Sequence, residues 1–321
     1  MRLQIWVVGI GILLLIIKFT AYFYTGSLAI LTDAVESIVN VAAGLFAMYS
    51  LNYAAQPKDD DHPYGHGKIE FISAGMEGTL VILAGGYILV EIARSAFEPH
   101  LVTGFGVGLP LVLISGGINY GMGRLLVRKG EAEKSPTMIA GGLHLITDAY
   151  SALGLLFGLL AVYCTHIYSM DLVFAGVFAA LIIYTGWGII QKAMAGIMDK
   201  ADLALAAEVI DCLDAKRQPD WIDLHNFRII QYGSALHIDC HVTVPYYYTV
   251  AEAHEVIKDL EDVLLANTKR DLEIFIHTDP CIPRLSCTVC TKTDCLVRAA
   301  PLKDLVSWRV ANVLVNEKHS L

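Results

Sequence analysis

Six long apolar segments fill the first 196 residues of this chain, and they constrain its fold more than any other feature. A helix that crosses a bilayer needs about 20 mostly apolar residues. The chain is 55% hydrophobic and only 17% charged, which is too apolar for a water-soluble protein of 321 residues. It is therefore predicted to be an α-helical membrane protein. The predicted spans are roughly 3–23, 28–51, 70–96, 101–123, 137–163 and 170–194.

Basic residues are unevenly distributed between the connections of these spans. The connections near 24–27 and 163–169 carry no Lys or Arg. The opposite side carries Arg2, Lys58, Lys68, Arg124, Arg128, Lys129, Lys134 and Lys200. Because Lys and Arg concentrate in cytoplasmic loops, both ends of the chain are predicted to lie in the cytoplasm, with the spans in the cell (inner) membrane. The first segment contains Lys18 and lacks a clear cleavage site, so we interpret it as a retained span.

Residues 199–321 are more polar and have the patterns of a water-soluble α+β domain. Their periodicity predicts helices at 202–215 and 250–266, and strands at 226–231, 235–244 and 272–278. We therefore expect a six-span transmembrane domain at 1–198, a cytoplasmic metal-binding and dimerisation domain at 199–280, and a Cys-rich C-terminal extension at 281–321.

Four polar residues interrupt two of the apolar spans at matching depth. His144 and Asp148 are four residues apart, as are Glu36 and Asn40, so each pair shares one helix face. An ionisable group at bilayer depth costs about 2.5–3.5 kcal/mol on insertion scales, which makes it a candidate functional residue. Imidazole and carboxylate groups suit Zn²⁺, and the oxygen ligands also admit Fe²⁺ or Mn²⁺. The alternative is hydrogen bonding between packed helices.

Two further groups of metal-competent residues lie outside the spans. In the connection DDDHPYGHGKIE, Asp59, His62 and His66 can converge across a turn, although a solvated charged loop is an equal alternative. The polar domain contributes a larger set. Its members are His225, His241, His254, His277 and Asp279.

Four of the seven cysteines cluster late in the chain, with the spacing C-x5-C-x2-C-x4-C. They are Cys281, Cys287, Cys290 and Cys295. In a reducing compartment, such a cluster favours a metal over disulfides. Tetrahedral Zn²⁺ is the first candidate, an iron–sulfur cluster the second, and free or redox-active thiols the alternative.

Several function classes find no support in the sequence. The net charge is -9 and no basic patch is interleaved with aromatic residues, which argues against a nucleic-acid partner. H-E-x-x-H, G-x-S-x-G and phosphate-loop motifs are all absent from the sequence. These absences weigh against an enzyme and against an ATP-driven pump.

Taken together, the motifs AILTDAVESIVN, HPYGHGKIE, HLITD and IHTDPC resemble the cation diffusion facilitator family of divalent-metal transporters, bacterial efflux type. The resemblance covers nearly the whole chain. It implies a homodimer with a metallochaperone-like, ferredoxin-like cytoplasmic domain, which exports a divalent ion in exchange for protons by alternating access. The ion would be Zn²⁺, or else Fe²⁺, Mn²⁺, Co²⁺ or Cd²⁺, and similar ions would occupy structural or regulatory sites.

The resemblance also assigns roles to individual residues. Glu36, Asn40, His144 and Asp148 would form the transport site. Within it we expect His144 to exchange the proton, because an imidazole titrates near neutral pH. The loop site would be Asp59, His62 and His66. The cytoplasmic dimer site would be His225, His241, His277 and Asp279, with His254 as a bridge. A charge interlock would join Lys68 and Asp199.

One part of the predicted transport site departs from the family pattern. Zinc-exporting relatives usually have Asp or His followed by Asp at the two positions occupied here by Glu36 and Asn40. This departure leaves the metal open and makes Asp33, one turn earlier, a possible additional ligand. Two other function classes stay as alternatives, namely an intramembrane metalloenzyme and a passive metal channel or sensor.

Overall fold

The chain folds into two compact units, residues 1–198 and residues 199–321. The structure is a computed structural model that describes residues 2–96, 104–133, 136–165, 167, 169–232, 235–268 and 271–320. The boundary between the units follows the last apolar segment, where the sequence changes from membrane-like to water-soluble composition.

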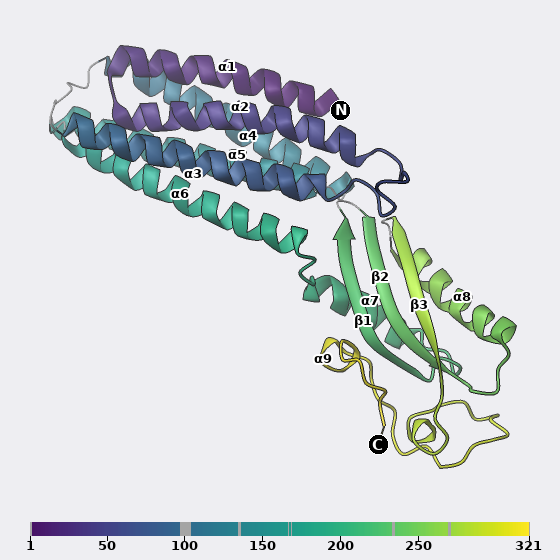
Figure 1. Ribbon diagram of the computed structural model, residues 1–321. Coiled ribbons are helices and arrows are strands. Elements are labelled where there is room, and N and C mark those ends of the chain that lie inside the picture. Colours follow the sequence, from purple (N-terminus) through teal and green to yellow (C-terminus); the bar gives the residue numbers. More distant parts are fainter. Residues whose placement is uncertain are drawn as a thin grey trace. The chain divides into compact units, whose positions relative to one another are not determined.

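Six long helices make up the first unit as far as it is described (Figure 1). They are α1 (Arg2–Thr25), α2 (Leu28–Ala54), α3 (Ile69–Ser95), α4 (Phe105–Glu133), α5 (Pro136–Thr165) and α6 (Ser169–Ile197). All six are long and apolar enough to cross a membrane, which confirms the predicted architecture. The fourth differs most from its prediction, because it continues past residue 123 to Glu133. Arg, Lys and Glu are good helix formers, so this helix does not stop where its apolar run stops.

Glycines allow two helix pairs to pack closely. On α4 and α5, a Cβ added to Gly123 would lie 2.7 Å from the Gly142 carbonyl oxygen. On α3 and α6, a Cβ added to Gly78 would lie 2.8 Å from the Gly186 carbonyl oxygen. Small residues at such crossings bring backbones together where no hydrophobic effect drives helix association in lipid.

The helix α2 packs against α1, α3, α5 and α6, which bury polar residues such as Asp33 and Glu36 against protein. A residue of another helix stabilises the N-terminal end of α2. Asp171 on α6 accepts hydrogen bonds from the Ser27 hydroxyl at 2.5 Å and the Leu28 N–H at 2.7 Å. A carboxylate at a helix N-terminus satisfies otherwise unpaired N–H groups and complements the helix dipole.

Apart from a short helix near its C-terminal end, the described part of the second unit contains a three-stranded mixed sheet with two helices (Figure 1). Its elements are α7 (Leu203–Ala215), β1 (Asp223–Tyr232), β2 (Ala235–Val244), α8 (Val250–Asn267) and β3 (Leu272–Pro280). The strand order is β1-β2-β3, with β1 antiparallel and β3 parallel to β2. The predicted α+β class is confirmed, and β1 begins three residues earlier than the predicted strand at 226.

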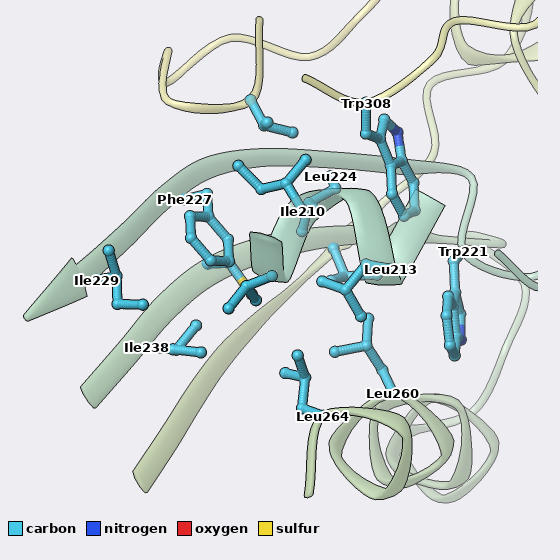
Figure 2. Close-up of a cluster of buried hydrophobic side chains, with 14 of the residues drawn as sticks. Ile210, Leu213, Trp221, Leu224, Phe227, Ile229, Ile238, Leu260, Leu264 and Trp308 are labelled. Atoms are coloured by element: carbon cyan, nitrogen blue, oxygen red, sulfur yellow. The ribbon is translucent and has the colours of Figure 1, made fainter. Parts of the chain in front are cut away.

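One face of this sheet packs against α7 and α8 to form the core of the unit (Figure 2). The C-terminal segment also contributes to this core, because Trp308 is 1% exposed and Val313 is fully buried. Between β3 and Trp308, the regular structure in this described stretch is the one-turn 3-10 helix η1 (Ser286–Thr288). A short helix, α9 (Val310–Val313), follows Trp308.

Candidate metal centres

Two helices of the first unit bring the predicted intramembrane residues together. Glu36 and Asn40 lie on α2, and His144 and Asp148 lie on α5. The Asn40 Nδ2 donates to Asp148 Oδ2 at 2.7 Å, and the Asn40 Oδ1 lies 2.8 Å from His144 Nε2. The Asn40 amide therefore joins the two residues of α5.

The orientation of the Asn40 amide determines where the proton of His144 sits. Only the NH₂ group of Asn40 can donate to the Asp148 carboxylate, so its carbonyl oxygen faces the imidazole. A carbonyl oxygen only accepts hydrogen bonds, so this network assigns a proton to His144 Nε2. A cation binding at Nε2 would have to displace that proton.

Glu36 completes a compact set of ligand atoms. Glu36, His144 and Asp148 each offer one ligand atom, and these atoms all lie within 4.8 Å of one another. The carboxylates are well shielded, since Asp148 is 1% exposed and Glu36 is 6% exposed. Two carboxylates in such a place need a cation or protons to offset their charge.

Glu77 on α3 is a candidate site residue that the sequence reasoning missed. A cavity of about 80 Å³ is lined by Glu77, Asn40 and His144, among others. The available signal was an acidic residue about two turns inside an apolar span, the same signal that identified Glu36. The cavity has room for water and places a third carboxylate near the imidazole.

Asp33 lies outside this set of ligand atoms and has a different partner. Its Oδ1 accepts a hydrogen bond from Lys18 Nζ at 2.7 Å, and both side chains are buried. Lys18 comes from α1, so the ion pair joins α1 to α2 one turn from Glu36. In this conformation Asp33 neutralises a lysine, and its role as an additional metal ligand stays a prediction.

The loop between α2 and α3 brings its three predicted residues together. Asp59 Oδ1 lies 3.0 Å from His62 Nδ1, and Asp59 Oδ2 lies 3.3 Å from His66 Nε2. Gly65 has a φ of 88°, a left-handed conformation that lets the loop turn between the two histidines. Desolvation raises the pKa of the Asp59 carboxyl, but the hydrogen bonds from His62 and the nearby His62 and His66 rings together outweigh it and lower the pKa.

On the sheet of the second unit, three histidines form a row across the strands. His225 pairs in register with His241, and His241 pairs with His277. Asp279 Oδ2 lies 3.1 Å from His225 Nε2 and 3.2 Å from His241 Nδ1. Ligand atoms of these two histidines and Asp279 lie within 4.8 Å of one another.

The remaining predicted residues of this site lie near or outside that group. His277 is exposed, and its Nε2 is 3.8 Å from Asp279 Oδ1. His254 on α8 is also exposed and lines a groove that reaches Asp279. The structure therefore assembles part of the predicted set, with His277 at its edge.

Asp223 and His319 extend this site in a way that the sequence reasoning did not anticipate. Asp223 Oδ2 lies 3.1 Å from His225 Nδ1, and the other oxygen of Asp223 is hydrogen-bonded to the His319 ring. Burial raises the pKa of the Asp223 carboxyl, but the His225 and His319 rings outweigh it and lower the pKa to about 2. A carboxylate behind a ligand histidine typically orients the ring.

Other predicted residues have more limited structural support. Lys68 directly precedes α3, and Asp199 has a left-handed φ of 55° after α6. They belong to different units, so the predicted charge interlock stays a prediction.

The four clustered cysteines are free, and no three of these described thiols lie within 4.8 Å of one another.

Comparison with known proteins covers both units. Residues 3–198 match the family described as Cation efflux transmembrane domain, and residues 207–281 match Cation efflux protein, cytoplasmic domain. An uncharacterized transporter of Synechocystis sp. is 28% identical over 276 residues, which cover 85% of this chain and 88% of that protein. The cation-efflux pump FieF of Salmonella arizonae is 28% identical over 290 residues, covering 88% and 94% of the two chains.

These matches extend over the helices and the sheet that carry the candidate centres. The family is one of membrane transporters and not of enzymes. The chain therefore belongs to the cation efflux family, also called the cation diffusion facilitator family, and is a cation efflux transporter.

Proposed function

We propose that this transporter exports a divalent transition-metal ion in exchange for protons. The observation that carries the proposal is the convergence of Glu36, His144 and Asp148, whose ligand atoms lie within 4.8 Å of one another between two transmembrane helices. Imidazole and carboxylate ligands suit Zn²⁺, and the carboxylates and the Asn40 amide also admit Fe²⁺, Mn²⁺, Co²⁺ or Cd²⁺.

Competition between the metal and protons would couple the two fluxes. A ligand must lose its proton before it binds a metal ion. The hydrogen-bond network assigns a proton to His144 Nε2, the nitrogen nearest Asn40 and Asp148. For this exchange the metal-free ring would be the doubly protonated imidazolium, so metal entry at Nε2 would release one proton and leave the other on Nδ1. Reprotonation of Nε2 on the outer side would then release the metal. Glu36 or Asp148 would assist by exchanging a second proton.

Alternating access would move this site between the two sides of the membrane. An antiporter needs two conformations that differ in their affinities for metal and proton. In our proposal α2 and α5 move relative to their neighbours while they keep the ligands together. The basic residues Lys58 and Arg128 flank the side that we assign to the cytoplasm, together with both chain ends.

The second unit would form a homodimer and sense cytoplasmic metal. The match to the cytoplasmic domain of cation efflux proteins supports dimerisation. His225, His241 and Asp279 would bind a regulatory ion, and His277 and His254 would join as this centre closes on metal. Asp59, His62 and His66 would hold a further ion in the loop between α2 and α3.

Transport by purified protein in proteoliposomes tests the antiporter. Asp148→Ala should reduce metal flux to the level of empty vesicles, because it removes one of three converging ligands. The wild-type flux should rise when a proton gradient favours exchange and should fall when the gradient is collapsed. A competition series with Zn²⁺, Fe²⁺, Mn²⁺, Co²⁺ and Cd²⁺ would identify the preferred ion. Native flux in the variant, or flux that ignores the gradient, would instead support a passive channel or a different site.

A further inference from the structure

The face of the sheet that carries the candidate metal group is covered by a later part of the chain. We call His225, His241 and Asp279 the sheet group. Asp223 pairs in register with Thr243, and Thr243 pairs with Asp279, so these residues share the face of the histidines. Thr243 is fully buried and Asp223 is 2% exposed, although α7 and α8 pack on the opposite face. Another segment must therefore shield them from water.

Two neighbouring residues of the C-terminal segment contact this face. The Lys318 Nζ donates to the Pro280 carbonyl oxygen at 2.9 Å and lies 3.7 Å from Asp279 Oδ1. The His319 N–H donates to Asp223 Oδ2 at 3.2 Å, and the His319 ring is hydrogen-bonded to Asp223 Oδ1. The two residues therefore bind both carboxylates at this end of the face.

A β-bulge in β1 anchors the same segment. The register of β1 and β2 shifts around Asn226, which has a left-handed φ of 49°. A bulge leaves its extra residue unpaired in the ladder, and the Asn226 N–H donates instead to the Val315 carbonyl oxygen at 2.8 Å. Trp308, earlier in the segment, is part of the core of the unit. Backbone and core contacts thus place Lys318 against Asp279.

The Lys318 ammonium takes a carboxylate oxygen that the predicted metal centre needs. Asp279 Oδ2 faces the two histidines of the sheet group, whereas Oδ1 lies 3.7 Å from Lys318 Nζ and 3.8 Å from His277 Nε2. An ammonium and a divalent ion a few ångströms apart repel each other by more than the energy of about a tenfold change in Kd. An ion that binds Asp279 must therefore displace Lys318 or bind more weakly.

His319 acts on the other side of the sheet group. Its ring is hydrogen-bonded to Asp223, and Asp223 Oδ2 lies 3.1 Å from His225 Nδ1. His319 therefore supports the carboxylate behind a ligand histidine, which favours metal binding. The match to the cytoplasmic domain of cation efflux proteins covers residues 207–281, so it assigns no role to either Lys318 or His319.

We propose that Lys318 is an intramolecular competitor of the metal ion and sets the metal affinity of the sheet group. The inference rests on the proposed role of that group as a sensor of cytoplasmic metal. An ion that enters the sheet group displaces the ammonium from Asp279 Oδ1, and His277 can then approach the freed oxygen. The competitor raises the metal concentration at which the sensor responds.

The test follows Zn²⁺ binding to the full-length protein in detergent by the hydrogen exchange of β2, which contains His241. Lys318→Met should lower the Zn²⁺ concentration at half-response about tenfold, because the competing charge is gone. Lys318→Arg keeps the charge and should stay near the wild type. The matched control Lys258→Met, an exposed change on α8, should not move the midpoint.

Two further readouts separate competition from a structural role. His319→Ala should raise the midpoint, because it removes a partner of the carboxylate behind His225. Zn²⁺ should increase the labelling of Lys318 by an amine-reactive reagent, measured by mass spectrometry, whereas Lys258 should label equally with and without Zn²⁺. A lysine that only stabilised the fold would weaken Zn²⁺ binding when it was replaced.

Failure of this inference can be told apart from failure of the proposed sensor. An unchanged or higher midpoint in Lys318→Met, or labelling of Lys318 that ignores Zn²⁺, overturns the competition. If His241→Ala abolishes the response in the same experiment, the sheet group still binds metal and only the inference fails. If β2 does not respond to Zn²⁺ in the wild type or in Lys318→Met, the sheet group binds no Zn²⁺ and both proposals fail.

Discussion

At the scale of single residues, the membrane unit contains more buried charge than its candidate ligands. Lys18 is 2% exposed and Asp33 is 7% exposed, and they pair at 2.7 Å between α1 and α2. Asp33 compensates the charge of Lys18 beside Glu36. The candidate ligand carboxylates Glu36 and Asp148 are therefore left to compensate the charge of a bound ion. Neither partner was predicted to bind the other, because the sequence alone does not reveal which residues of α1 and α2 face each other.

Lys18→Met should destabilise the protein more than the double variant Lys18→Met/Asp33→Asn. Removing one partner leaves a buried charge without compensation, which costs about 3–5 kcal/mol, whereas removing both charges is often close to neutral. Thermal unfolding in detergent measures the difference, and the double variant should recover most of the lost melting temperature. Equal losses in both variants would show that the pair does not stabilise the fold.

Asp223→Asn should weaken the second unit near neutral pH and have little effect in strong acid. The folded pKa of Asp223 is about 2, below its unfolded value, so its charge contributes stability above about pH 4 that is lost as the pH falls through 2. The shift corresponds to about 2 kcal/mol. Unfolding of the second unit, followed by hydrogen exchange at pH 7 and pH 3, tests this, and about half of the effect at pH 7 should remain at pH 3, midway between the folded and unfolded pKa values. Asp211→Asn, an exposed change on α7, is the control, and an identical effect at every pH would contradict the assignment.

At the scale of elements, glycine contacts determine how closely the helices that carry the site can approach. Gly123 on α4 faces Gly142 on α5, two residues before His144. A side chain at this crossing would shift α5 and the ligands that it carries. The apolar runs predicted the helices, but the choice of neighbours depends on these contacts between residues far apart in sequence.

Gly123→Ala should reduce transport and stability, whereas Gly121→Ala on the same helix should leave transport unchanged and should not lower stability. An added Cβ at 123 would lie 2.7 Å from a backbone carbonyl oxygen, whereas at 121 it meets nothing within 4 Å. Overpacked contacts usually cost about 1–3 kcal/mol. Melting temperature and metal flux in proteoliposomes measure both effects. Matching behaviour of the two variants would show that the α4–α5 contact is not tightly packed.

At the scale of the whole molecule, the membrane helices and the α+β class could be predicted from the sequence, whereas several contacts could not. Apolar length and alternation depend on local sequence, so the six spans and β2 were predictable. His144 and Asp148 were identified because charge is rare in a span. Glu77, Asp223 and His319 were missed because their importance depends on which elements pack together, and His319 comes from a tail with no periodic pattern.

Each unit carries its own candidate metal group, and variants should separate their proposed roles in transport and sensing. His241→Ala removes a ligand of the sheet group and should slow transport about tenfold at low metal concentration, since a sensing site acts where metal is scarce. At saturating metal its flux should approach the native value, because the intramembrane ligands are intact. Asp148→Ala should abolish flux at every metal concentration. The tryptophan fluorescence of its second unit should still respond to added Zn²⁺, because the sheet group is unchanged. Asp239→Asn, an exposed change on the same strand as His241, is the matched control and should match the wild type at every concentration. If His241→Ala loses flux equally at all concentrations, the sheet group is part of the transport path rather than a sensor.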